Sequence, residues 1–253
     1  PDAPLALEGA RATHIVNEWD FYKPVGWSSM SPVMDGPLSM QVYYDAFASC
    51  YRAFEAKGQG KFFEAHDHLV LHLGSSPKFV RHAFEQGLAA AYGEGAISAD
   101  DMEQRFQRLL GPSLRLAASI GPMHTAATYV NLTSLLLHAS PQRGAKIGVF
   151  SFGSGAAASM YRLRVRGSAR VNTRVTELLE TRIQHSAAEF DALAERYKLT
   201  YGRFDWAPNV AGEPVAPAYR LRSVDVLGKR IYEGLRYSTL ALPVSSPSAQ
   251  SAK

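Results

Sequence analysis

The sequence predicts a mixed α/β domain, because helical and strand-like hydrophobic patterns both occur along it. Residues 39–57 and 78–92 repeat apolar side chains at three- and four-residue steps, as amphipathic helices with one buried face do. Residues 146–152 form a continuous apolar run, and residues 161–166 alternate apolar and basic side chains, as buried and half-buried strands do. With 253 residues, 46% of them hydrophobic, the chain is long enough to bury a sizeable core.

The first predicted helix, residues 39–57, carries a single apolar stripe. The stripe consists of Met40, Tyr43, Phe47, Cys50, Tyr51 and Phe54. We expect Cys50 to be a core residue and not a nucleophile, because burial raises the pKa of a thiol. As the single cysteine it excludes an internal disulfide, and it fits a reducing compartment.

Three further helices and their ends follow from local patterns. The helix over 78–92 is followed by one that starts at Ser98, where the spacing to Asp101 is typical of a capping box. That helix is expected to end at Gly111. Residues 124–139 are apolar nearly all round, which predicts a largely buried helix.

The second half of the chain changes its period. Residues 153–155, Gly-Ser-Gly, form a tight turn that joins the two predicted strands into an antiparallel pair. Helical patterns return over 174–197, and a further strand fits 218–226. We predict one mixed α/β domain over residues 1–242, followed by a flexible, polar tail over 243–253.

Charge and hydropathy exclude some classes of function. The net charge of +4 is mild and the arginines are scattered, so no nucleic-acid surface is predicted. A diffuse positive field suits phosphate-bearing substrates equally well. The sequence lacks a window of about 18 uncharged apolar residues, so no membrane span is predicted.

An ordered set of segments covers nearly the whole chain. It comprises DFYKP (20–24), SPVMDGPLS (31–39), GPMHTAATYVNLTSLL (121–136), KIGVFSFGSGAAASMYRLRV (146–165) and AYRLRSVDVLGKRIY (218–232). In this order the segments resemble signatures of hydroxymethylglutaryl-CoA synthases, a family of the thiolase superfamily. The resemblance implies the C-terminal half of a thiolase-like, five-layered αβαβα sandwich. It also assigns a strand at Leu5 to Glu8 to the other half.

The resemblance implies a missing partner. In the family these segments occupy the second half of a chain roughly twice as long, and this chain starts with Pro1 instead of Met, as a processed product or a piece of a longer protein would. We therefore expect a separate N-terminal half chain of the same fold, in a dimer of such pairs or a larger assembly. A lone half is expected to aggregate or to bind a hydrophobic dye, because it exposes the apolar face that the other half covers.

The family reaction is a Claisen condensation of acetyl-CoA with acetoacetyl-CoA, a step of isoprenoid (mevalonate) synthesis. A cysteine takes the acetyl group, a glutamate removes a proton from its methyl, and a histidine assists at the acceptor carbonyl. In the family the cysteine and the glutamate lie in the N-terminal half, and Cys50 does not match the nucleophile's motif. The resemblance thus implies an acyltransferase that is inactive as this chain alone and takes coenzyme A thioesters as substrates without a further cofactor.

Residues 71–78 resemble the family's F-H-x-P-x-x-K motif with one extra residue before the lysine. The resemblance makes His72 the catalytic histidine that holds the acceptor carbonyl, and Lys78 the contact to the coenzyme A phosphates. The alternative is that His72 is an ordinary satisfied histidine before a loop. Ser151, Gly153 and Ser154 match the family's glycine-rich hairpin, where glycines let the backbone approach a thioester, although a tight hairpin alone also requires them.

Pro122 departs most clearly from the family pattern. The family has an asparagine there, whose side-chain amide helps to hold the acceptor oxygen, whereas proline offers no donor at all. His124 replaces the family's tyrosine and is able to donate a hydrogen bond nearby. His66 and His68 are two residues apart, but no third ligand is near them in the sequence, so we predict a solvated loop there and no metal site.

Two interpretations remain open at this point. The first is a two-chain hydroxymethylglutaryl-CoA synthase-like enzyme, favoured by His72, Lys78 and the hairpin. The second is a catalytically inactive, synthase-derived structural subunit of a larger assembly, favoured by Pro122 and the missing half. A third interpretation, an isolated nucleic-acid or acyl-CoA binding module, is supported only by the mild positive charge. The compartment, mitochondrial or cytoplasmic, is left undecided.

Overall fold

The computed structural model describes residues 3–25, 31–58, 60–74, 76–168, 171, 174–208 and 219–234. The chain divides into two compact units, of which the first extends to Gln184 without residues 26–30. The second unit holds the described residues from His185 onward. The limits of the single domain predicted over 1–242 stay a prediction, and the tail 243–253 lies outside the described residues.

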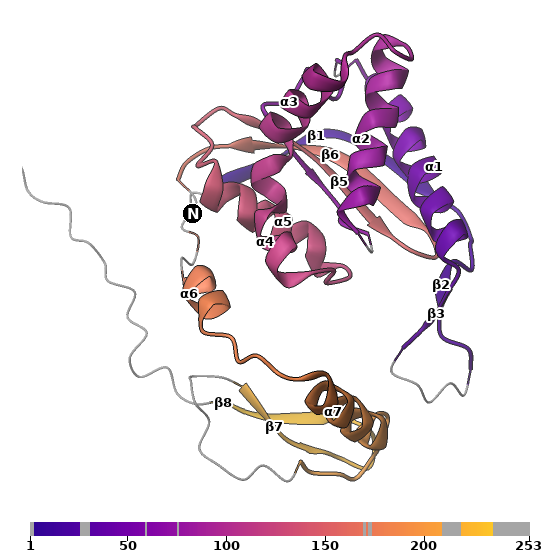
Figure 1. The fold of residues 1–253 in the computed structure, drawn as a ribbon, viewed down its shortest axis with the longest axis vertical. Helices are drawn as coiled ribbons and strands as arrows, with labels where there is room; N and C mark the ends of the chain where they lie inside the picture. Colours follow the sequence, from indigo (N-terminus) through magenta and orange to yellow (C-terminus); the bar gives the residue numbers. More distant parts are fainter. Residues whose placement is uncertain are drawn as a thin grey trace, which may run out of the picture. The chain divides into compact units, whose positions relative to one another are not determined.

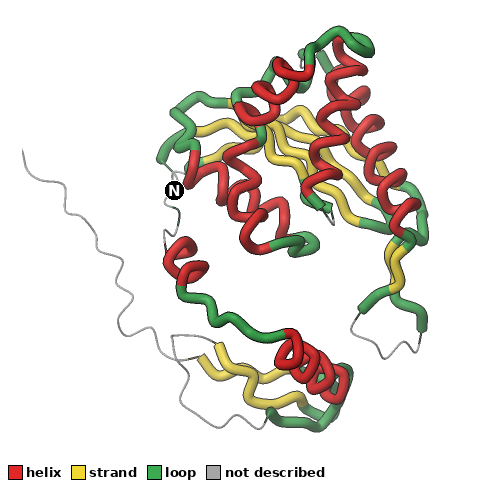
Figure 2. The backbone as a smooth tube through the Cα atoms, in the orientation of Figure 1, coloured by secondary structure: helices red, strands yellow, loops and turns green. Residues whose placement is uncertain are grey.

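A four-stranded sheet forms the centre of the first unit (Figures 1 and 2). Its strands are β1 (Leu5–Ile15), β4 (His68–Leu71), β5 (Lys146–Gly153) and β6 (Ala157–Val165), in the order β1-β6-β5-β4. β4 and β5 are parallel, and the other neighbours are antiparallel. The predicted hairpin of β5 and β6 is confirmed.

The assignment of the N-terminal strand to the other half is wrong. β1 is longer than predicted and pairs with β6, from Leu5 opposite Val165 to Ile15 opposite Ala157. It therefore completes the sheet of this chain. Pairing between segments this far apart in sequence is set by long-range register, which a local pattern does not contain.

Three helices cover one face of the sheet, namely α1 (Gly36–Glu55), α2 (Pro77–Tyr92) and α3 (Ala99–Leu109) (Figure 1). All three were predicted. The Ser98 side chain accepts a hydrogen bond from the Asp101 amide, so the predicted cap is confirmed. Phe47 and Phe54 of α1 pack into the core together with Phe150. Cys50 is fully buried, which raises the pKa of its thiol to about 11, as expected of a core residue.

The next two helices are α4 (Gly111–Ile120) and α5 (Ala126–His138). Gly111 ends the preceding helix as predicted, but with Pro112 it also begins α4, because proline suits the first turn of a helix. The sequence pattern does not reveal this helix. α5 packs Leu135 onto the second face of the sheet, yet it is not buried all round, since Tyr129 is 69% exposed.

The second sheet face is covered only in part. α5 covers β4 and β5, where Val70 and Val149 are buried. On β6, which lies farther from α5 in the strand order, Leu163 is only half-buried, and Leu7, opposite it on β1, is 54% exposed. Among the described residues of this unit, an apolar strip along β6 and β1 is thus left partly open.

The helical patterns predicted over 174–197 form two helices. α6 (Arg174–Glu180) belongs to the first unit. Arg182, which follows this helix, donates a hydrogen bond of 2.7 Å to the carbonyl of Ser119. The second unit contains α7 (Ala187–Thr200), which starts at a capping box on Ser186. It also contains the antiparallel hairpin of β7 (Tyr219–Val224) and β8 (Arg230–Gly234). No helix among the described residues is long and apolar enough to span a membrane.

Candidate functional site

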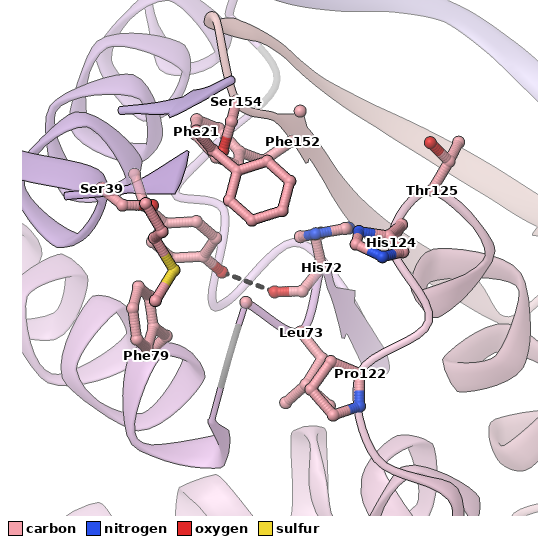
Figure 3. A pocket seen from close by; sticks show the side chains of 14 residues that line it. Phe21, Ser39, His72, Leu73, Phe79, Pro122, His124, Thr125, Phe152 and Ser154 are labelled. Carbon is pink, nitrogen blue, oxygen red and sulfur yellow. Dashed lines mark hydrogen bonds between the residues drawn. The ribbon is translucent and has the colours of Figure 1, made fainter. Parts of the chain in front are cut away.

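A cavity of about 380 Å³ opens in the first unit at the ends of β4 and β5 (Figure 3). Two short strands, β2 (Phe21–Tyr22) and β3 (Val33–Met34), contribute to its wall. Most of its lining is apolar and aromatic. The lining residues are Phe21, Met34, Ser39, Tyr43, His72, Leu73, Gly74, Phe79, Pro122, His124, Thr125, Phe152, Gly153 and Ser154.

Four of the predicted site residues meet in this cavity: His72, Pro122, Gly153 and Ser154. They come from three segments that are far apart in the sequence. Lys78 lies in the first turn of α2 with an exposed side chain, and Ser151 lies in β5 and is half-buried. Neither of these two lines the cavity, so the structure does not bring all the predicted residues together.

His72 directly follows β4 and is 7% exposed. Its backbone amide donates to the carbonyl of Phe150 at 2.7 Å, and its carbonyl accepts from the Tyr43 hydroxyl at 2.8 Å, the dashed line in Figure 3. Burial lowers the pKa of the imidazole to about 4, with a further contribution from the charge of His124. At neutral pH the ring is therefore uncharged, and one of its nitrogens carries a proton to donate.

Helix α5 supports the same segment from the other side. The Asn131 side chain donates to the carbonyl of Leu71 at 2.9 Å, and the Thr128 hydroxyl lies 3.3 Å from Nδ1 of His72. Both side chains are buried. The backbone and the ring of His72 are thus held by groups from two helices, α1 through Tyr43 and α5.

Asp20, from the DFYKP segment, holds the turn of the glycine-rich hairpin. Its carboxylate accepts from the Gly155 amide at 2.9 Å, and its backbone carbonyl accepts from the Asp35 amide at 2.9 Å. The Asp20 side chain is fully buried. The next residue, Phe21, lines the cavity. The segment therefore anchors the hairpin and supplies a wall of the cavity.

Pro122 and His124 lie in the loop between α4 and α5, and both line the cavity (Figure 3). His124 has a φ of 49°, in the left-handed region, which costs a residue other than glycine about 1 kcal/mol or more. Its ring centroid lies 5.9 Å from that of Phe21. The loop thus holds an imidazole at the cavity, next to a position where proline offers no donor.

His66 is buried, so the predicted solvated loop is wrong. Its Nδ1 lies 2.6 Å from the carbonyl of Phe62, and its Nε2 accepts from Nε of Arg162 at 2.9 Å. Arg162 also pairs with the carboxylate of Glu8. His68, partly buried, starts β4. In the described part of the chain no group of three or more His, Cys, Asp or Glu residues is arranged to hold a metal ion.

Sequence patterns alone do not identify the aromatic wall or the supports of His72. Tyr43 and Phe79 belong to apolar helix stripes, where a core residue and a cavity residue have the same spacing. One usable signal is the hydroxyl of Tyr43, because a buried tyrosine normally requires a hydrogen-bond partner. Phe21 is easier to predict as a site residue, since it lies within a segment that carries the family resemblance.

Comparisons with known proteins fit this architecture. The family model described as hydroxymethylglutaryl-coenzyme A synthase C terminal matches residues 5–86 and 94–234. The mitochondrial hydroxymethylglutaryl-CoA synthase of Sus scrofa is 32% identical over 285 residues, covering 92% of this chain and 56% of that protein. The structure of MvaS in complex with 3-hydroxy-3-methylglutaryl coenzyme A is 25% identical at a TM-score of 0.72, covering 91% of this chain and 58% of that one. PksG, an HMG-CoA synthase from Bacillus subtilis, is 19% identical at a TM-score of 0.77, covering 92% and 59%.

The fold is therefore that of the thiolase-like synthases, as the sequence predicts. Within this class the chain belongs to the hydroxymethylglutaryl-CoA synthase family, and it carries the family's C-terminal domain. It spans a little over half the length of the curated relatives it matches.

Proposed function

We propose that this chain supplies the acceptor side of a hydroxymethylglutaryl-CoA synthase-like enzyme, which condenses acetyl-CoA with acetoacetyl-CoA. His72 holds the acceptor carbonyl as a neutral hydrogen-bond donor. The glycine-rich hairpin, at Gly153 and Ser154, lets the thioester approach the backbone. The cysteine nucleophile and the glutamate base come from an N-terminal half of the same fold, carried by a separate chain.

The observation that carries this proposal is the meeting of His72 with the hairpin in one cavity. A neutral imidazole in a largely apolar cavity stabilises the negative charge that develops on a carbonyl oxygen during condensation. The low pKa of His72 supports this role, because a cationic ring would be costly in the same surroundings. Lys78 and Ser151 stay proposals for coenzyme A and substrate contacts outside the cavity wall.

The partly open sheet face supports the need for a second half. Along β6 and β1 the apolar side chains of Leu163 and Leu7 lack a complete cover within the unit. A helix from a second thiolase-like half, packed beside α5, would bury this strip. The occupant we propose is the N-terminal half, because it would bring the nucleophile and base to the same cavity.

Pro122 favours a second candidate, a catalytically inactive structural subunit derived from a synthase. Loss of one oxyanion donor lowers the rate of comparable enzymes by about 10²–10³. His124 lines the same cavity and is the available substitute. A subunit that keeps the fold for assembly alone has no need of a donor at either position.

The test is to isolate the chain from its native source and identify co-purifying proteins by mass spectrometry. The two-chain enzyme predicts a second chain with a thiolase-like N-terminal half that contains a cysteine nucleophile and a glutamate. The same preparation should consume acetoacetyl-CoA when acetyl-CoA is added. A complex with that partner but without condensing activity would support the structural subunit, and a preparation without any such partner would refute the two-chain enzyme.

A further inference from the structure

The Thr128 hydroxyl has one hydrogen-bond partner among the described residues, Nδ1 of His72 at 3.3 Å. Thr128 lies in the first turn of α5 and is 5% exposed, so water has little access to it. The opposite ring nitrogen of His72, Nε2, has no protein partner in the described part of the chain. Because Nε2 is nevertheless not fully buried, it faces the cavity that His72 lines.

The chemistry of a hydroxyl decides which nitrogen of His72 carries the proton. A buried hydroxyl donates its hydrogen to an acceptor wherever one is available, because leaving a buried donor without a hydrogen bond destabilises the protein. The acceptor within reach of Thr128 is Nδ1 of His72. If Nδ1 accepts, it carries no proton, and in a neutral imidazole the proton is then on Nε2.

We infer that Thr128 is a positioning residue that holds His72 in the tautomer with the proton on Nε2, directed at the cavity. In this form His72 donates a hydrogen bond to a carbonyl oxygen in the cavity. In the other tautomer Nε2 would present a lone pair and repel that oxygen. The inference rests on the proposed function for its catalytic consequence, whereas the tautomer itself is a property of this chain.

The hydrogen bonds to the backbone on either side of the ring make this a fixed arrangement. Tyr43 holds the carbonyl of His72, and Asn131 holds the carbonyl of Leu71. With the backbone fixed from α1 and from α5, the ring of His72 has little freedom to exchange the partner of Nδ1. Thr128 then acts on the proton and not on the position of the chain.

The test combines Thr128→Val, which keeps the shape of the side chain and removes the donor, with Thr128→Ser, which keeps the hydroxyl. Thr133→Val is the matched control, the same substitution five residues further along α5. The tautomer of His72 is read in the full chain from the ¹⁵N resonances of labelled histidine, assigned by comparison with His72→Gln. Condensation is measured in the complex with the N-terminal half.

The wild type, Thr128→Ser and Thr133→Val should all show an unprotonated Nδ1 and a protonated Nε2. In Thr128→Val the other tautomer should appear, and kcat should fall about tenfold, the value of one lost hydrogen bond of about 1.4 kcal/mol. A wild-type His72 protonated on Nδ1, or a Thr128→Val variant with an unchanged tautomer, would overturn the inference. A tautomer that shifts in a protein without any condensing activity would leave the role of Thr128 standing and refute the proposed function instead.

Discussion

His66 should make the protein less stable below neutral pH. The imidazole is 4% exposed and bridges the Phe62 carbonyl and the Arg162 guanidinium through its two ring nitrogens. Burial, together with the charge of Arg162, lowers its pKa from 6.5 to about 4. Protonation of His66 would place an N–H donor at Nε2, opposite the Nε–H donor of Arg162. The charged ring can no longer accept this hydrogen bond, so the bridge is lost.

The sign and size of the effect follow from linkage between protonation and folding. The folded state disfavours the proton, so stability is fully present above the unfolded pKa of 6.5 and is lost as pH falls toward 4. The full contribution is about 3 kcal/mol, at about 1.4 kcal/mol for each pKa unit. Between pH 7 and pH 5 the loss due to His66 is about 2 kcal/mol.

The assay is urea unfolding followed by circular dichroism at both pH values, for the wild type and for His66→Gln. Glutamine retains a donor and an acceptor for the bridge but does not titrate. Because His72 has a pKa of about 4 in both proteins, its similar contribution cancels in the comparison. The wild type should lose about 2 kcal/mol more than His66→Gln, with the exposed His82→Gln as a control that behaves like the wild type. Equal losses in the wild type and His66→Gln would refute the buried bridge.

Two further predictions concern the proposed enzyme. The isolated chain should bind a hydrophobic dye through the open strip of Leu7 and Leu163, and added N-terminal half should reduce the fluorescence; weak binding by the chain alone would show that the strip needs no partner. Pro122→Asn should raise the condensation rate of the complex by about tenfold or more, since it restores a donor of a kind worth about 10²–10³ in comparable sites. If the asparagine slows a complex that is already as fast as ordinary synthases, His124 or another group already fills this role.

The sequence predicts the elements of this fold well where a local pattern decides them. The stripes of α1 and α2, the cap at Ser98 and the hairpin of β5 and β6 all follow from spacing. α4 is not predicted, because Gly111 and Pro112 resemble the end of a helix, although they also suit the start of one. The pairing of β1 is not predicted, because its partner β6 lies some 150 residues away in the sequence, as the pairing of Leu7 with Leu163 illustrates.

The site is predictable to the extent that motifs carry it. His72, Pro122, Gly153 and Ser154 come from segments of family resemblance, and they meet in the cavity. The supports of His72 do not follow from any pattern, because Thr128 and Asn131 lie in a helix whose apolar character dominates. The burial of His66 does not follow from the local pattern for a related reason, since its hydrogen-bond partner Arg162 lies 96 residues further along the chain.

In the proposed enzyme, His72 acts at the acceptor carbonyl in a complex with an N-terminal half. The test is the condensation rate of that complex with the wild-type chain, with His72→Ala and with His82→Ala. Circular dichroism verifies that the three proteins are equally folded. His72→Ala should lower the rate by about 10² or more, the range of a lost transition-state donor, while His82→Ala should leave it unchanged. An active complex that loses no activity with His72→Ala would show that His72 does not act at the acceptor carbonyl.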